Sequence, residues 1–74
     1  MKIKITGIVK YQELEGGFWS IIGDDDTEYA AMGMPEQLKY EGRRVSVQAS
    51  HFEGLSMMMW GTPITIHTFH TLMP

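Results

Sequence analysis

Residues 2–12 alternate between apolar and polar side chains, and a glycine stands in the middle of the alternation. One face carries Ile3, Ile5, Val9 and Tyr11, and the other carries Lys2, Lys4, Thr6, Ile8 and Lys10. Alternation with a period of two predicts a β-strand with one buried face. Gly7 interrupts the apolar face, and a glycine inside a strand often marks a bend or a bulge. We therefore expect a first strand that bends at Gly7 and belongs to both sheets of a small barrel.

Further segments predict strands because they combine apolar side chains with flanking turn residues. They are residues 18–22, 28–32 and 43–52, and a last long strand over residues 55–60 and 64–72. The aspartate-rich residues 23–27 predict the hairpin turn between the second and third strands, because short polar side chains tolerate turn geometry. We expect a break in the last strand at residues 61–63, because Pro63 cannot donate a ladder hydrogen bond.

Residues 34–42 lose this alternation and predict one or two helical turns. Pro35 suits the first helical position, where a backbone N–H has no intrahelical partner. Gly42 suits the left-handed residue that ends a helix. Leu38 would then point into the interior and plug the core.

The predicted order is three strands, a short helix and two strands. With 74 residues the chain forms a single domain, residues 1–74. This order predicts an all-β fold, a five-stranded OB-like Greek-key barrel with one short helix between the third and fourth strands. An SH3-like barrel is the alternative that the pattern leaves open.

Two blocks of the sequence resemble a known kind of domain. They are EGGFWSIIGDD at residues 15–25 and MWGTPI at residues 59–64. With Leu38, Gly42 and Val45 they resemble a family of small, uncharacterised prokaryotic OB-fold-like domains, over most of the chain. The resemblance implies the fold and the size, and it carries over no catalytic residue. Asp26 and the run Met57–Met59 lie outside the pattern, so any role for them would be particular to this chain.

The chain has no cysteine, which excludes disulfides, a thiolate nucleophile and a zinc–cysteine site. No apolar run approaches the ~20 residues of a membrane-spanning helix. The N-terminus alternates lysine and isoleucine, unlike the continuous apolar stretch of a signal peptide. We therefore expect a cytoplasmic protein with no membrane association, either monomeric or weakly dimeric.

The patterns of common catalytic and metal sites are missing from this sequence. The serines stand in no nucleophile-elbow motif, and there is no phosphate loop or dinucleotide fingerprint. His67 and His70 are three residues apart, which predicts opposite faces of a regular strand, although a bulge could bring them to one face. His51, on the fourth strand, could approach either of them across the ladder. The run of aspartates at residues 24–26 lacks the alternation of a calcium loop. We expect no enzyme, no cofactor and no metal, with a Met/His site that uses Met57–Met59 as a lesser alternative.

Aromatic and methionine side chains form the candidate ligand-binding surface. In OB folds the face of the second and third strands, with the adjoining loops, is the usual binding surface. The candidate contacts are Phe18, Trp19, Tyr29, Met58 and Trp60. The alternative reading places the large apolar side chains in the core. We expect a non-catalytic module that binds a protein or a small molecule through this face and residues 57–60.

Single-stranded nucleic acid is the alternative ligand. The aromatic side chains could stack on bases, and phosphates would contact the basic residues Lys2, Lys4, Lys10 and Arg44. The net charge of −3, from six basic and nine acidic residues, weighs against this alternative because affinity for phosphates depends on neutralised charge.

Overall fold

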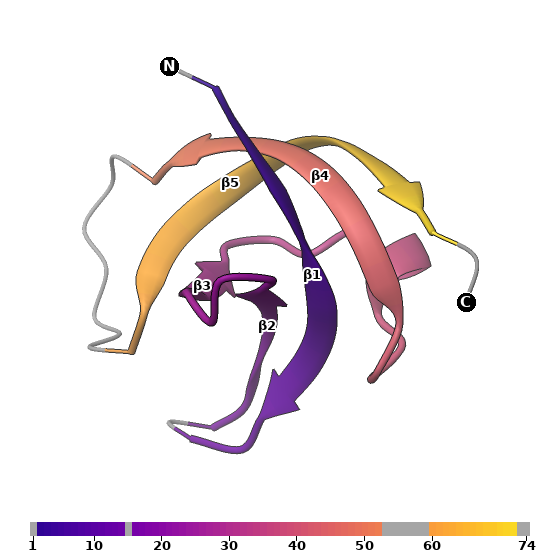
Figure 1. The fold of residues 1–74 in the computed structure, drawn as a ribbon. Coiled ribbons are helices and arrows are strands. Elements are labelled where there is room, and N and C mark those ends of the chain that lie inside the picture. The colour runs from indigo at the N-terminus through magenta and orange to yellow at the C-terminus, as the bar shows by residue number, and fades with distance from the viewer. Residues whose placement is uncertain (1, 15, 53–59, 73–74) are drawn as a thin grey trace.

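The computed structural model describes residues 2–14, 16–52 and 60–72, and their strands close into a barrel (Figure 1). The strands are β1 (Ile3–Gln12), β2 (Phe18–Gly23), β3 (Glu28–Ala31), β4 (Arg44–His51) and β5 (Thr62–Thr71). Their order around the barrel is β1-β2-β3-β5-β4, with β3 and β5 parallel and every other pair antiparallel. The predicted OB-like barrel is confirmed, since β4 separates β1 from β5, whereas an SH3-like barrel would pair those two strands.

β1 takes part in two ladders that overlap at its central glycine. Residues 3–8 pair with β4, and residues 7–12 pair with β2. Gly7 lies opposite Gly23 in one ladder and opposite Val45 in the other. A Cβ atom at Gly7 would lie 2.8 Å from Gly23 Cα and closer still to the Ile22 carbonyl oxygen. The predicted bend at Gly7 is confirmed, and the reason is this close approach of β2.

The alternating side chains of the strands fill the interior of the barrel. The buried cluster takes Ile5 and Val9 from β1, Ile21 from β2, and its other members are Ala31, Met34, Leu38, Val45, Val47, Ala49 and Ile64. Ile3, Trp19, Tyr29, Ile66 and Phe69 are partly buried and pack against this cluster. These residues lie on the predicted apolar faces, because alternation decides which side of each strand is buried. Tyr11, expected on the apolar face of β1, is an exception and is 39% exposed.

The segment between β3 and β4 is less helical than the sequence predicts. It contains a single 3-10 turn, η1 (Glu36–Leu38), in which the Leu38 amide donates to the Pro35 carbonyl at 2.9 Å. Pro35 is the N-cap rather than the first helical residue, and Gly42 has a φ of 87° in a later turn rather than at a helix end. Leu38 is nevertheless fully buried, as predicted. No helix in the described part of the chain is long and apolar enough to cross a bilayer.

β5 differs from its predicted course at two places. Thr62 and Pro63 belong to the strand instead of breaking it, and the bend falls at Gly61, with a φ of 63°. Pro63 is tolerated because it is the second residue of β5 and lies past the end of β4, where its carbonyl still accepts a hydrogen bond from the Phe52 amide at 3.0 Å. The predicted strand residues 55–59 lie outside the described residues.

The second difference in β5 is a β-bulge opposite the Gln48–Ala49 bond. Ala49 pairs with Ile66 and Gln48 with Thr68, so His67 is the extra residue. Such an insertion shifts the alternation by one residue. His67 and His70 are therefore both exposed, because the strand is not the regular one to which the expectation of opposite faces applied.

Candidate ligand-binding surfaces

The outer face of β2 and β3 has a centre made of small side chains. Ser20 and Ala30 are cross-strand partners, and they point outward because their neighbours Ile21 and Ala31 belong to the core. Both are nonetheless 0% exposed. Ser20 Oγ donates to the Lys10 carbonyl at 2.8 Å and accepts from the Gln12 side-chain amide at 3.3 Å. The hydroxyl is therefore satisfied, and it fixes β2 against β1 on this face.

Two aromatic side chains meet on the same side of the barrel. Phe18 is the first residue of β2, and Trp60 lies two residues before β5. Their ring centroids are 5.2 Å apart at an interplanar angle of 62°, which is a favourable edge-to-face arrangement. Both residues are only partly buried, so each keeps part of its surface for other contacts. We call the surface formed by the partly exposed Phe18, Ile22 and Trp60, beside the fully buried Ser20 and Ala30, the aromatic face.

The other predicted ligand contacts lie elsewhere. Trp19 packs against the core and makes an edge contact with Tyr11, its partner across the β1–β2 ladder, at 5.1 Å between centroids. Tyr29 also packs against the core. Met58 lies outside the described residues. The structure thus brings together Phe18 and Trp60, and it places Trp19 and Tyr29 on the inward sides of their strands.

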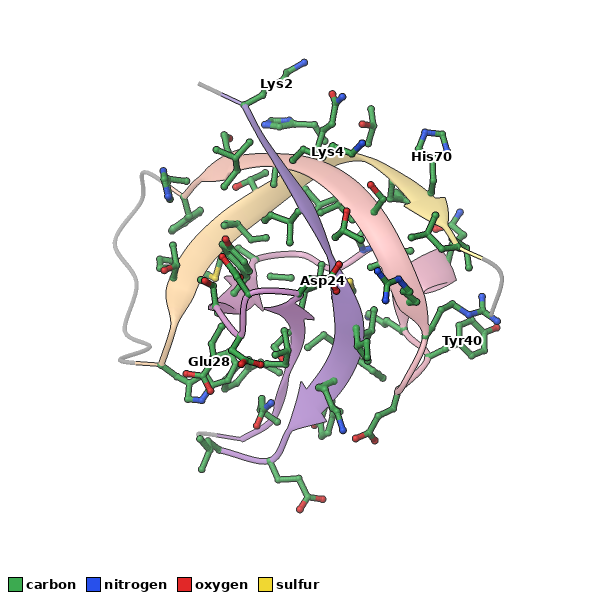
Figure 2. The ribbon with its side chains drawn as sticks, in the orientation of Figure 1. Lys2, Lys4, Asp24, Glu28, Tyr40 and His70 are labelled. Carbon is green, nitrogen blue, oxygen red and sulfur yellow. The ribbon has the colours of Figure 1, made fainter. Side chains whose placement is uncertain are left out.

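A hollow of about 280 Å³ opens where β1 separates from β2. It is lined by Lys4, Ile5, Thr6, Gly23, Asp24, Asp25 and Tyr29. Lys4 and the aspartates stand out separately in the sequence, but their meeting at one hollow was not predicted. The bend at Gly7 was the available signal, because it moves the N-terminal half of β1 from β2 to β4 and leaves space beside the β2–β3 hairpin. Figure 2 labels Lys4 and Asp24 in this region.

Both signs of charge occur around the hollow. Arg44 Nη2 lies 2.9 Å from Asp24 Oδ2, and both side chains are about half exposed. Asp25 Oδ1 accepts a hydrogen bond from the Thr27 amide at 3.1 Å, the local arrangement by which aspartate stabilises a turn. Asp26, with a φ of 67°, provides the left-handed residue of this hairpin.

The hydrogen bonds of the hairpin lower the pKa of Asp25. The bond from the Thr27 amide contributes most, and the Thr27 side chain adds to it, so the pKa lies below the ordinary value of 3.8. We expect a carbon-detected NMR titration to place the Asp25 midpoint below 3.8. Because the folded pKa is the lower one, the contribution of this group to stability is present above 3.8 and is lost as pH falls through the folded value. A midpoint at or above 3.8 would contradict this assignment.

The bulge in β5 turns His67 towards a serine of β4. Ser50 Oγ and His67 Nε2 are 2.8 Å apart. A serine–histidine pair is part of a nucleophilic site, which also requires a group that orients the histidine. Within the described ranges no hydrogen bond joins His67 to a carboxylate, and no group of three His, Asp or Glu residues could hold a metal ion. We assign no chemistry to this pair.

The four predicted nucleic-acid contacts do not form one patch. Lys4 and Lys10 are exposed on the outer face of β1, and Lys2 is exposed just before the strand begins. Lys10 lies opposite Ser20 and therefore borders the aromatic face, whereas Lys2 and Lys4 project from the other end of the strand (Figure 2). Arg44 is engaged by Asp24.

Comparison of the chain with protein-family models, with curated proteins and with solved structures finds no match.

Proposed function

We propose that this chain is a non-catalytic binding module whose ligand, a protein segment or a small molecule, contacts the aromatic face. The observation that carries the proposal is the Phe18–Trp60 pair. Two large rings from separate parts of the chain meet at 5.2 Å outside the core, and both stay partly exposed. Partly exposed aromatic pairs provide rigid apolar contact area, which is what anchors a ligand.

The surroundings of the aromatic face suit ligand recognition. Polar side chains border it, namely Lys10 and Gln12 from β1 and Glu28 from β3. A few polar groups around an apolar surface fix the orientation of a ligand and give specificity. In OB folds the corresponding face of the second and third strands is the usual binding surface.

Titration with indole, as a probe for aromatic ligands, tests this proposal. We expect amide shifts in a two-dimensional NMR spectrum to cluster at residues 10–12, 18–22 and 28–30 and at the Trp60 side chain. Phe18→Ser should weaken the binding of indole about fivefold, because it removes one ring of the pair. Tyr40→Ser is the matched control, since Tyr40 is 56% exposed and lies across the barrel from Glu28 (Figure 2). Shifts centred on Tyr40, or an unchanged affinity of Phe18→Ser, would refute the proposal.

Single-stranded nucleic acid is a second candidate ligand, favoured by the position of Lys10 beside the aromatic face. Stacking on Phe18 and Trp60 would then combine with phosphate contacts from the lysines of β1. If all three lysines act, the slope of log affinity against log salt should be about −2 for a mixed oligonucleotide. Lys10→Ala should reduce the magnitude of that slope by about 0.7. Lys39→Ala is the control, because Lys39 pairs with Glu36 at 2.8 Å, and it should leave the slope unchanged. Undetectable binding of the oligonucleotide at low salt would exclude this ligand.

We also infer a cytoplasmic, non-enzymatic protein that belongs to the prokaryotic OB-like family named above. The absence of cysteine supports a reducing compartment. In the part of the chain that the structure describes, no carboxylate is hydrogen-bonded to His67 beside Ser50, which supports binding rather than catalysis. Metal binding by methionine and histidine is the least supported candidate. It would need residues 57–59, which lie outside the described part of the chain.

A further inference from the structure

The N-terminal half of β1 has one edge that pairs with no strand among the described residues. β4 pairs with this half on one side, from Ile3 onward. On the other side the ladder with β2 begins only at Gly7. Figure 1 shows β1 continuing past the end of β2 towards the N-terminus. An unpaired strand edge is a template for an added strand.

The backbone groups of Lys4 point to this open edge. In an antiparallel ladder the N–H and C=O of one residue point to the same neighbour, and the direction alternates along the strand. Val9 directs both groups towards the β4 side, where it bonds with Arg43 and Gly42. The Thr6 carbonyl accepts from the Asp24 amide, on the opposite side. By alternation, the N–H and C=O of Lys4 point the same way as those of Thr6, beside the hollow.

We propose that an acidic, extended peptide with a free N-terminus binds here as an added strand, antiparallel to β1. It would follow the line along which β2 runs, starting beyond Asp24. Because Asp24 already occupies the position opposite Thr6, the peptide must begin at this point. Its terminal ammonium would lie near Asp25, which lines the hollow. Strand addition and capture of a terminal amine are both recurring modes of peptide recognition.

Charge complementarity selects the side chains of the peptide. Residues opposite each other across a ladder project from the same face of the sheet. The second and fourth peptide residues would face Lys4 and Lys2, so acidic side chains fit there. The first and third would face Ile5 and Ile3, on the inward side, so apolar side chains fit there. A second copy of β1 does not fit, because in the same register its Lys2 and Lys4 would lie opposite Lys4 and Lys2, and like charges directly opposite are destabilising.

The probe is the peptide Ile-Glu-Val-Glu with a free N-terminus and an amidated C-terminus. In an NMR titration we expect shifts confined to residues 2–6 and 23–25, with slower hydrogen exchange at the Lys4 amide. Methylation of the backbone nitrogen of the second peptide residue should weaken binding at least about fivefold, because that N–H donates to the Lys4 carbonyl. Methylation at the third residue is the matched control, since its N–H points away from β1. Acetylation of the N-terminus should also weaken binding.

A charge exchange tests the side-chain assignment without relying on a loss of binding alone. Lys4→Glu should weaken binding of Ile-Glu-Val-Glu about threefold, and the peptide Ile-Lys-Val-Glu should restore it. Phe18→Ser should not affect either titration, so this site and the aromatic face are tested separately. The proposal is overturned if the peptide causes no shifts, if the shifts centre on Phe18 and Trp60, or if both methylated peptides bind equally.

Discussion

Replacing Gly7 with alanine is expected to lower the free energy of unfolding by about 3 kcal/mol, as an atom forced into a close-packed site does. The new Cβ would lie 2.8 Å from Gly23 Cα and still nearer to the Ile22 carbonyl oxygen. Both are backbone atoms, so no flexible side chain can move aside. β2 would have to shift away from β1, although Gly7 also holds its place opposite Val45 in the β4 ladder. A domain of this size has a total stability of roughly 3–5 kcal/mol, so only about 0–2 kcal/mol should remain.

Urea denaturation followed by far-UV circular dichroism measures this loss. Gly33→Ala is the matched control, because Gly33 has a φ of 80° and a Cβ there meets nothing within 4 Å. Gly33→Ala should lower the free energy of unfolding by only about 1 kcal/mol, which is the strain of a non-glycine residue in the left-handed conformation. Equal losses in the two variants would mean that close approach at Gly7 contributes nothing beyond backbone strain.

The parts of the fold that local pattern decides were predictable from the sequence. Alternation in residues 2–12 gave the buried side of β1, and Gly7 marked the place where this strand passes from one ladder to the other. Leu38 was expected in the core because it is the central apolar residue of a segment flanked by turn residues. The buried side of β1 and the places of Gly7 and Leu38 depend on residues that are neighbours in the chain, so the local periodicity of the sequence predicts them.

The features that the sequence did not predict depend on contacts between distant residues. The bulge at His67 arises from the register between β4 and β5. No residue type within β5 predicts a bulge at this position. The short 3-10 turn also lies beyond local pattern, since a nine-residue segment with proline and glycine at its ends is compatible with a longer helix. Tertiary context overrides weak local propensity in such segments.

The candidate sites show the same division. Phe18 and Trp60 were identified individually, but their edge contact joins residues 42 positions apart and required the fold. The hollow was missed, because Lys4 and Asp25 meet only once β1 bends away from β2. The sequence therefore identifies unusual residues one by one. Which of them become neighbours on the surface depends on the register of the strands and the closure of the barrel.

Truncating Leu38 to alanine is expected to destabilise the protein by about 3 kcal/mol, within the range for buried leucines. Leu38 is the only leucine in the buried core of the described residues, and it is 0% exposed. It belongs to a single 3-10 turn, so its position depends on two short-range hydrogen bonds, from the Leu38 amide to Pro35 and from the Lys39 amide to Glu36. Removal of its side chain leaves a cavity among strand residues that the closed ladders hold in place, which limits collapse around the gap.

The test is again the free energy of unfolding from urea titration, with Met34→Leu as the control. Met34 belongs to the same buried cluster and is 7% exposed, but this exchange conserves volume and should cost less than about 1.5 kcal/mol. If the cavity is the cause, Leu38→Met should recover most of the stability that Leu38→Ala loses, because it refills the space. If Leu38→Ala costs no more than Met34→Leu, the segment between β3 and β4 does not close the core, and the ladders of the barrel alone stabilise the fold.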